Sequence, residues 1–184
     1  VFLCHGNLDY NLISSKFQGS VCKKIGYPRY DGVISKGGSL KVLCNEILEI
    51  DQNKPIIFWV PAYMKFKSES VENIRLWLPM VKKLTSKFNV IIRPHPKTLK
   101  VNPEIISILK DTELIVDNKF DRKLSVIYKA AELVLADYGG SVLDSIYMEK
   151  KCILLNLPSH YEFSKWRKKG KYIDREVRED IESI

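Results

Sequence analysis

The clearest indication of the fold is the segment Leu133-Val134-Leu135-Ala136-Asp137-Tyr138-Gly139-Gly140-Ser141. Its first four residues are all apolar, without the polar alternation of a half-exposed strand, which is typical of a strand buried on both faces of a parallel sheet. Two glycines and a serine follow, and these residue types favour a turn and the start of a helix. The stretch therefore predicts a strand, a tight loop and a helix in succession.

The same alternation extends to both sides of this stretch. Continuous apolar runs predict strands at 56–60, 90–92, 114–116, 133–136 and 152–155. Apolar residues at helical spacing predict helices near 39–48, 70–87, 103–110, 124–131 and 141–149. Pro79 should kink or break the second of these helices. Strands that alternate with helices predict an α/β fold, a Rossmann-like parallel sheet with helices on both faces.

Polar or turn-forming residues follow three of the predicted strands. These segments are Pro61-Ala62-Tyr63, Arg93-Pro94-His95-Pro96 and Asp137-Tyr138-Gly139-Gly140-Ser141. In open parallel sheets, ligands bind outside the carboxyl ends of the strands. We therefore expect the three segments to converge on one binding site.

The loop with Gly139 and Gly140 has the residue types of an anion site. Paired glycines let the backbone approach a ligand closely, and Ser141 can cap the helix whose first amides point outward. This chemistry suits a pyrophosphate, although an ordinary glycine turn with a serine cap fits the same residues. The chain has neither GxGxxG nor GxxxxGK[ST], so a dinucleotide fingerprint and a P-loop are unsupported.

Arg93 and His95 are the more specific pair. Arg93 could bind phosphate oxygens or pair with Asp137 across the sheet edge, and His95 could donate a hydrogen bond to a phosphate. A structural ion pair and a turn histidine are the alternative. His5 follows an apolar run, and an imidazole is a natural general base, but its position alone fits a loop histidine equally well.

The composition indicates which classes of partner the protein can bind. The 184 residues provide room for one domain, and Lys and Arg outnumber Asp and Glu by 30 to 22, a net charge of +8. This surplus favours anionic partners such as nucleotides or an anionic membrane surface, although solubility alone would also explain it. The basic cluster Lys165-Trp166-Arg167-Lys168-Lys169 lacks the regular aromatic interleaving of a single-strand groove, so we expect no nucleic-acid partner.

The cysteines and histidines do not indicate a metal site. Four cysteines are widely spaced without a CxxC pair, and only three histidines are present. No apolar run approaches the roughly 20 residues of a membrane span, and no signal-peptide pattern occurs. We therefore expect reduced thiols and a cytoplasmic protein, which the basic cluster could hold at the inner face of the cell membrane.

Taken together, the motifs resemble those of the bacterial CDP-glycerol glycerophosphotransferase family, the teichoic-acid primases and polymerases. The matching segments are, in order, His5-Gly6, Gly26-Tyr27-Pro28-Arg29-Tyr30-Asp31, Trp59-Val60-Pro61-Ala62-Tyr63, Arg93-Pro94-His95-Pro96, Ala136-Asp137-Tyr138-Gly139-Gly140-Ser141 with Asp144, and Lys151-Cys152-Ile153-Leu154-Leu155-Asn156. The resemblance implies the GT-B architecture, two Rossmann-like lobes with the active site between them. It also implies transfer of glycerol phosphate from CDP-glycerol to a hydroxyl of a membrane-linked wall or capsule polymer, without metal or cofactor.

The resemblance also assigns roles to residues. It implies that His5 is the base and that His95 contacts the phosphates of the nucleotide donor. The expected donor-binding residues are Pro61, Tyr63, Arg93, Asp137, Gly139, Gly140, Ser141 and Asp144. We expect residues 1–38 to connect to a missing amino-terminal acceptor lobe and residues 39–184 to form the donor-binding domain.

Two departures from the family pattern leave the donor open. The family commonly has two serines where this chain has Gly139 and Gly140, and an acidic residue near the segment Pro158-Ser159-His160. A ribitol-phosphate donor is one alternative. A GT-B glycosyltransferase or epimerase that uses a sugar nucleotide is another, and a donor-binding module without activity of its own is a third.

Overall fold

The computed structural model describes residues 1–31, 43–44, 47, 49–63 and 67–156. Its centre is a five-stranded sheet in the order β5-β4-β3-β6-β7, and every neighbouring pair is parallel. The strands are β3 (Ile56–Val60), β4 (Asn89–Ile92), β5 (Ile115–Val116), β6 (Ala131–Ala136) and β7 (Lys151–Leu154). Each ends within two residues of its predicted end, so the predicted Rossmann-like parallel sheet is confirmed.

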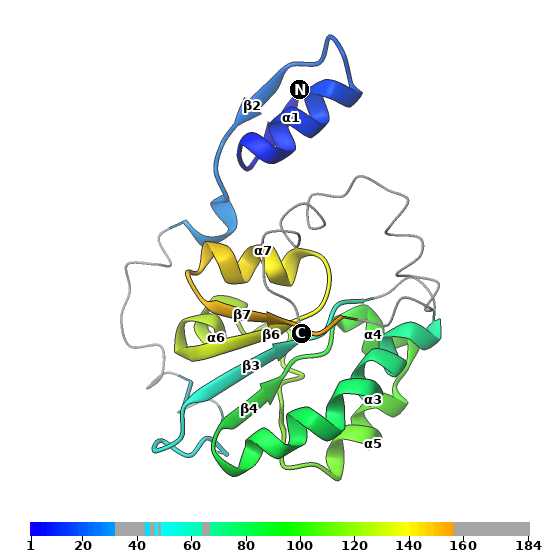
Figure 1. Ribbon diagram of the computed structural model, residues 1–184, viewed down its shortest axis with the longest axis vertical. Coiled ribbons are helices and arrows are strands. Elements are labelled where there is room, and N and C mark those ends of the chain that lie inside the picture. The colour runs from blue at the N-terminus through cyan, green and yellow to red at the C-terminus, as the bar shows by residue number, and fades with distance from the viewer. Residues whose placement is uncertain (32–42, 45–46, 48, 64–66, 157–184) are drawn as a thin grey trace.

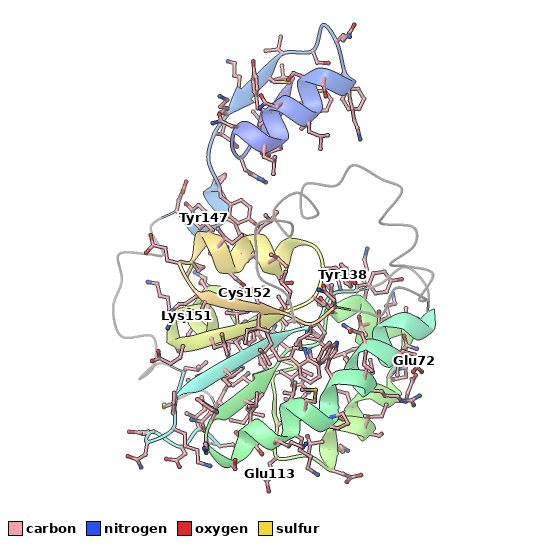
Figure 2. All side chains as sticks on the ribbon, in the orientation of Figure 1. Glu72, Glu113, Tyr138, Tyr147, Lys151 and Cys152 are labelled. Atoms are coloured by element: carbon pink, nitrogen blue, oxygen red, sulfur yellow. The ribbon has the colours of Figure 1, made fainter. Side chains whose placement is uncertain are left out.

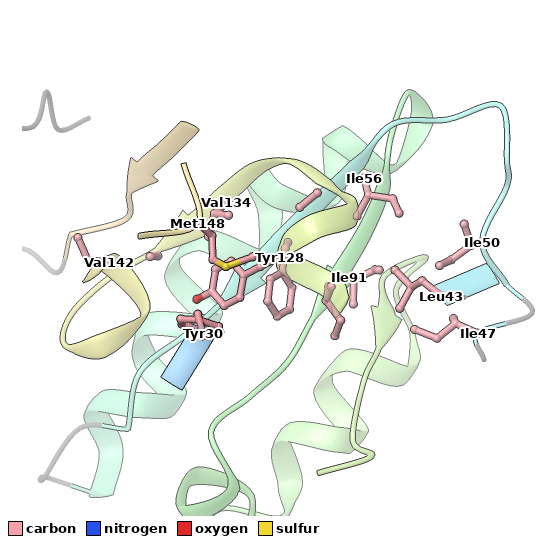
Figure 3. Packing of buried hydrophobic residues seen from close by; sticks show 14 of the residues in the cluster. Tyr30, Leu43, Ile47, Ile50, Ile56, Ile91, Tyr128, Val134, Val142 and Met148 are labelled. Carbon is pink, nitrogen blue, oxygen red and sulfur yellow. The ribbon is translucent and has the colours of Figure 1, made fainter. Parts of the chain in front are cut away.

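Helices cover both faces of the sheet, as expected (Figure 1). One face carries α3 (Lys67–Lys83), α4 (Pro96–Val101) and α5 (Glu104–Lys110), and the other carries α6 (Leu124–Ala130) and α7 (Gly140–Tyr147). Successive residues of β3 face opposite sides of the sheet and are buried on both sides, which is why the strand is apolar throughout. Phe58 packs in the cluster with Tyr128 of α6, and Trp59 packs in the cluster with Ile74 of α3. Figure 3 shows the first cluster, with the rings of Tyr30 and Tyr128 close together.

Two local expectations differ from the structure. Of the kink or break expected at Pro79, the break does not occur: helix α3 continues through this residue, and Ile74 before it and Val81 after it are buried in the same cluster. Helix α4 was not expected, and its six residues begin directly after His95. Most of the helix expected at 39–48 lies outside the described residues, although Leu43 and Cys44 are helical. The 3-10 turn η2 (Leu84–Ser86) leads from α3 toward β4.

The first residues form a small unit of their own. Strands β1 (Phe2–Cys4) and β2 (Cys22–Lys24) pair in parallel, with α1 (Asn7–Lys16) between them. The apolar run before His5 forms β1. Helix α1 was not expected, because its only buried residue is Asp9 and its pattern is barely amphipathic. A 3-10 turn, η1 (Pro28–Tyr30), then leads toward the main sheet (Figure 1). The proposed boundary near residue 38 and the basic cluster at 165–169 lie outside the described residues and stay predictions.

None of the helices in the described part of the chain combines the length and the apolar character that a membrane span requires.

Candidate functional site

A cavity of about 520 Å³ lies at the carboxyl edge of the sheet. Its walls come from the ends of β3, β4 and β6, from the start of α7 and from η1. The lining residues are Arg29, Val60, Pro61, Ala62, Tyr63, Arg93, Pro94, His95, Pro96, Lys97, Phe120, Leu124, Tyr138, Gly139, Gly140, Ser141 and Asp144. Every candidate site residue from the sequence lies here except His5 and Asp137. The three segments that were expected to converge therefore do so.

The glycine loop turns sharply into α7. Gly139 has φ 77° and ψ −147°, a backbone conformation that is essentially open to glycine alone, and it is the residue that caps α7. The expected cap was Ser141, but helical backbone already begins at Gly140, which places Ser141 inside the first turn. Gly140 and Ser141 of that turn line the cavity, and the amides at the start of a helix have no partner within it and carry a partial positive charge.

Arg93 is buried and held on one side by a neighbouring carboxylate. Its Nη1 donates to Asp117 Oδ2 at 2.9 Å and to the carbonyl oxygen of Arg122 at 3.0 Å. The guanidinium of Arg122 pairs with the same carboxylate. Arg93 thus pairs with Asp117 and not with Asp137, because β5 is the neighbour of β4 whereas β6 lies two strands away. Asp117 directly follows a strand, as Arg93 does, and that position could have identified it from the sequence.

Asp137 forms part of the wall behind the cavity. Its carboxylate is fully buried and accepts from the amides of Ala62 and Tyr138, at 2.8 and 2.6 Å, and from Asn73 Nδ2 at 2.5 Å. These contacts join the ends of β3 and β6 to α3. A carboxylate that is bound in this way supports the edge that carries the cavity, which is a different task from contacting an anionic phosphate. Sequence reasoning did not identify Asn73.

His95 caps α4 with its own side chain. The Nδ1 atom accepts from the amide of Lys97 at 3.1 Å, so the neutral ring carries its proton on Nε2. Desolvation, and then the charge of Lys97, lower the pKa of His95 below its ordinary 6.5. The ring centroid lies 5.8 Å from that of Tyr63. His95 is therefore set to present an Nε2–H donor, and Lys97, which the sequence analysis did not single out, adds a nearby cation.

Asp144 is buried, and its carboxylate accepts hydrogen bonds from residues at the start of η1. Tyr27 donates its hydroxyl to Asp144 Oδ1 at 2.6 Å, and Arg29 Nη1 lies 3.2 Å from Oδ2. Burial and the hydrogen bond to Asp144 raise the pKa of Tyr27. Figure 2 shows Tyr138 at the cavity end of α7 and Tyr147 near the other end, beside the segment that Tyr27 belongs to. The contacts fasten η1 to α7 and bring Arg29 into the cavity wall.

His5 contacts Tyr27, the tyrosine that also donates a hydrogen bond to Asp144. Its ring meets the ring of Tyr27 edge-on, with the centroids 4.7 Å apart, and its Nδ1 is 3.5 Å from Asp9 Oδ2. His5 does not line the cavity itself. Tyr27 contacts both His5 and Asp144, so the small unit and the cavity meet at this tyrosine.

Comparison with known proteins identifies relatives of this arrangement. Residues 9–178 match the family model described as CDP-Glycerol:Poly(glycerophosphate) glycerophosphotransferase. No curated protein matches the chain. Among solved structures, the wall teichoic acid polymerase TagF is similar with a TM-score of 0.60 and 15% identity, over 92% of this chain and 41% of that one. The chain thus spans about two fifths of that polymerase structure.

Sugar-nucleotide enzymes share the fold as well. The UDP-GlcNAc 2-epimerase from Neisseria meningitidis bound to UDP-GlcNAc has a TM-score of 0.60 and 16% identity, over 79% of this chain and 41% of that one. The ADP-heptose heptosyltransferase II of E. coli has a TM-score of 0.51 and 13% identity, over 65% of this chain and 37% of that one. At these identities the likeness establishes the fold, which is that of the GT-B transferases and epimerases.

Proposed function

The chain belongs to the CDP-glycerol:poly(glycerophosphate) glycerophosphotransferase family, and we propose that its cavity binds a CDP-activated polyol phosphate, CDP-glycerol first among them. In the complete enzyme, the glycerol phosphate is transferred to a hydroxyl of a cell-wall polymer acceptor. The matched family is one of transferases, and one of the similar TagF structures is of a variant soaked with CDPG.

One observation carries the proposal: the cavity gathers several groups that attract anions. The start of α7 presents backbone amides, His95 presents its Nε2–H, and Arg29 and Lys97 add positive charge. Gly139 and Gly140 add no side chain to this wall, so a phosphate can approach the backbone closely there. This combination suits a diphosphate better than a neutral ligand.

The order of the strands suggests how the nucleotide lies. Phe120 and Leu124 follow β5 and form an apolar part of the cavity, while Gly139–Ser141 follow β6. Three strand spacings separate β5 from β6, about 14 Å, a length that a nucleoside diphosphate can span. We place the cytosine toward Phe120, whose ring lies 5.8 Å from the Arg93 guanidinium, and the diphosphate toward α7 and His95.

A calorimetric titration with CDP-glycerol tests this proposal at His95. A charge-assisted hydrogen bond contributes roughly 1.5–3 kcal/mol, so His95→Ala should weaken binding about tenfold to hundredfold without unfolding the protein. Arg93→Ala should also weaken binding, but it removes a partner from a buried ion pair and should lower stability as well. His95→Ala is therefore the cleaner variant.

A second titration series identifies the donor class. CDP-ribitol, UDP-sugars and CMP-sugars should bind less tightly than CDP-glycerol. Tighter binding of a sugar nucleotide would favour the alternative of a glycosyltransferase or epimerase, with which the chain shares its fold. Unchanged affinity for CDP-glycerol in His95→Ala would remove His95 from the site.

A further inference from the structure

Arg29 is placed in the cavity by two residues that hold only one end of its guanidinium. Its side chain is 55% exposed, whereas the carboxylate of Asp144 beneath it is 4% exposed. Both of its hydrogen bonds to described residues leave from Nη1, one to Asp144 at 3.2 Å and one to the Tyr27 hydroxyl at 3.5 Å. Within the part of the chain that the structure describes, no residue accepts a hydrogen bond from the other guanidinium donors, and Arg29 is one of the residues that line the cavity.

Stability alone gives a weak reason for this arrangement. A half-exposed ion pair contributes only about 0–1 kcal/mol. Asp144 also accepts a short hydrogen bond from Tyr27, 2.6 Å long, so a hydrogen bond supports it without the arginine. What Arg29 adds is a fixed cation with a planar fork, the geometry that matches phosphate oxygens.

The position of Arg29 indicates which phosphate it faces. Asp144 lies about one helical turn after Ser141 in α7, and Tyr27, the other residue that holds Arg29, contacts the ring of His5. Arg29 is thus held by one residue of α7 and by the tyrosine that contacts His5 of the small unit. A phosphate bound there would be the one nearest to His5.

We propose that Arg29 binds the β-phosphoryl group of the donor, the group that is transferred, and that Asp144 is the positioning residue for its guanidinium. This inference rests on the proposed function. In the transfer, the acceptor oxygen forms a bond to the β-phosphorus and gives up its proton to a base, the role that the family resemblance implies for His5, while the bond from that phosphorus to the bridging oxygen breaks and CMP leaves. Arg29 neutralises the charge on the non-bridging oxygens of the phosphoryl group.

Two nucleotides that differ by the β-phosphate provide the test. Calorimetry with CDP and with CMP should show that Arg29→Ala weakens CDP binding about tenfold to hundredfold and leaves CMP binding unchanged. Arg29→Lys should recover part of the CDP affinity, because it keeps the charge without the fork. Asp144→Asn, which loses the acidic partner, should reduce the preference for CDP over CMP.

Arg75→Ala is the matched control. Arg75 is 53% exposed and pairs with Glu72 on α3, but it does not line the cavity, so this variant should bind both nucleotides normally. Equal loss of CDP and CMP in Arg29→Ala, or no loss of either, would overturn the inference while the wild type still binds CDP. Failure of the wild type to bind CDP would overturn the proposed function, and this inference with it.

Discussion

The imidazole of His95 has a fixed tautomer and a lowered pKa, and these two properties determine how it responds to an anion. In the absence of a ligand, desolvation and the positive charge of Lys97 disfavour protonation of the ring. A bound diphosphate reverses that balance, because a nearby negative charge favours the imidazolium. Binding of the donor should therefore be coupled to proton uptake by this residue.

The affinity for CDP-glycerol should rise as the pH falls below about 6.5, the ordinary pKa of histidine. The sign follows because the complex binds a proton that the free protein binds only at lower pH. CDP-glycerol is suited to the experiment, since both of its phosphates are esterified and keep their charge across this range. Calorimetry at several pH values measures the slope.

His95→Ala should remove that slope. A variant that keeps the full pH dependence would show that another group takes up the proton.

The lowered pKa of His95 also affects the stability of the free protein, with the opposite dependence on pH. The unfolded chain protonates His95 more readily, so the free energy of unfolding should decrease as the pH falls below 6.5, and less so in the variant.

At the scale of elements, the turn from β6 into α7 places two adjacent glycines in different backbone conformations. Gly139 has a positive φ, whereas Gly140 is the first helical residue. A Cβ at either position meets nothing within 4 Å, so steric clash with other residues does not distinguish them. The two positions therefore differ in backbone strain alone, so a substitution at Gly140 is a control for the same substitution at Gly139.

Gly139→Ala should lower the free energy of unfolding by about 1–3 kcal/mol, the cost of a side chain in that region of φ and ψ. Gly140→Ala should leave stability unchanged or raise it slightly, since alanine suits a helix better than glycine. If the phosphate contacts the backbone as proposed, Gly140→Ala should nonetheless weaken CDP binding. Chemical denaturation and calorimetry measure the two effects; equal destabilisation by both variants would contradict the strain at Gly139.

The small unit β1-α1-β2 and the main sheet together place His5 near the cavity, although His5 does not line it. Asp9 lies 3.5 Å from its Nδ1, and Tyr27 meets its ring. An acceptor hydroxyl that attacks the β-phosphorus needs a base on the side opposite the leaving group. We propose that His5 is that base in the complete enzyme.

His5→Ala should reduce turnover by roughly two to four orders of magnitude, the usual contribution of a general base, while the affinity for CDP-glycerol stays nearly the same. Initial rates of polymer extension and calorimetry on the same preparation measure the two quantities. His95→Ala provides the contrast, because it should weaken donor binding. Normal turnover in the His5 variant, or a requirement for a divalent cation in the wild type, would contradict this division of roles.

The amino-acid sequence alone was enough to predict the strands of the main sheet, most of its helices and the edge at which the site lies. Apolar runs and helical stripes depend on near neighbours in the chain, so strands such as Ile56–Val60 and helices such as α5 could be predicted. The carboxyl ends of parallel strands share one edge, so the convergence of Pro61, Arg93 and Gly139 on the cavity could be predicted too. The motifs also indicated the family that the match of residues 9–178 establishes.

The contacts between these side chains could not be predicted in the same way. Arg93 pairs with Asp117 because β5 lies beside β4. Asp137 accepts a hydrogen bond from the amide of Ala62 because β6 lies beside β3. Arg29 reaches Asp144 across 115 positions of the chain. Such contacts depend on the order of the strands and on the path of η1, which the packing of the whole core sets and no local periodicity records.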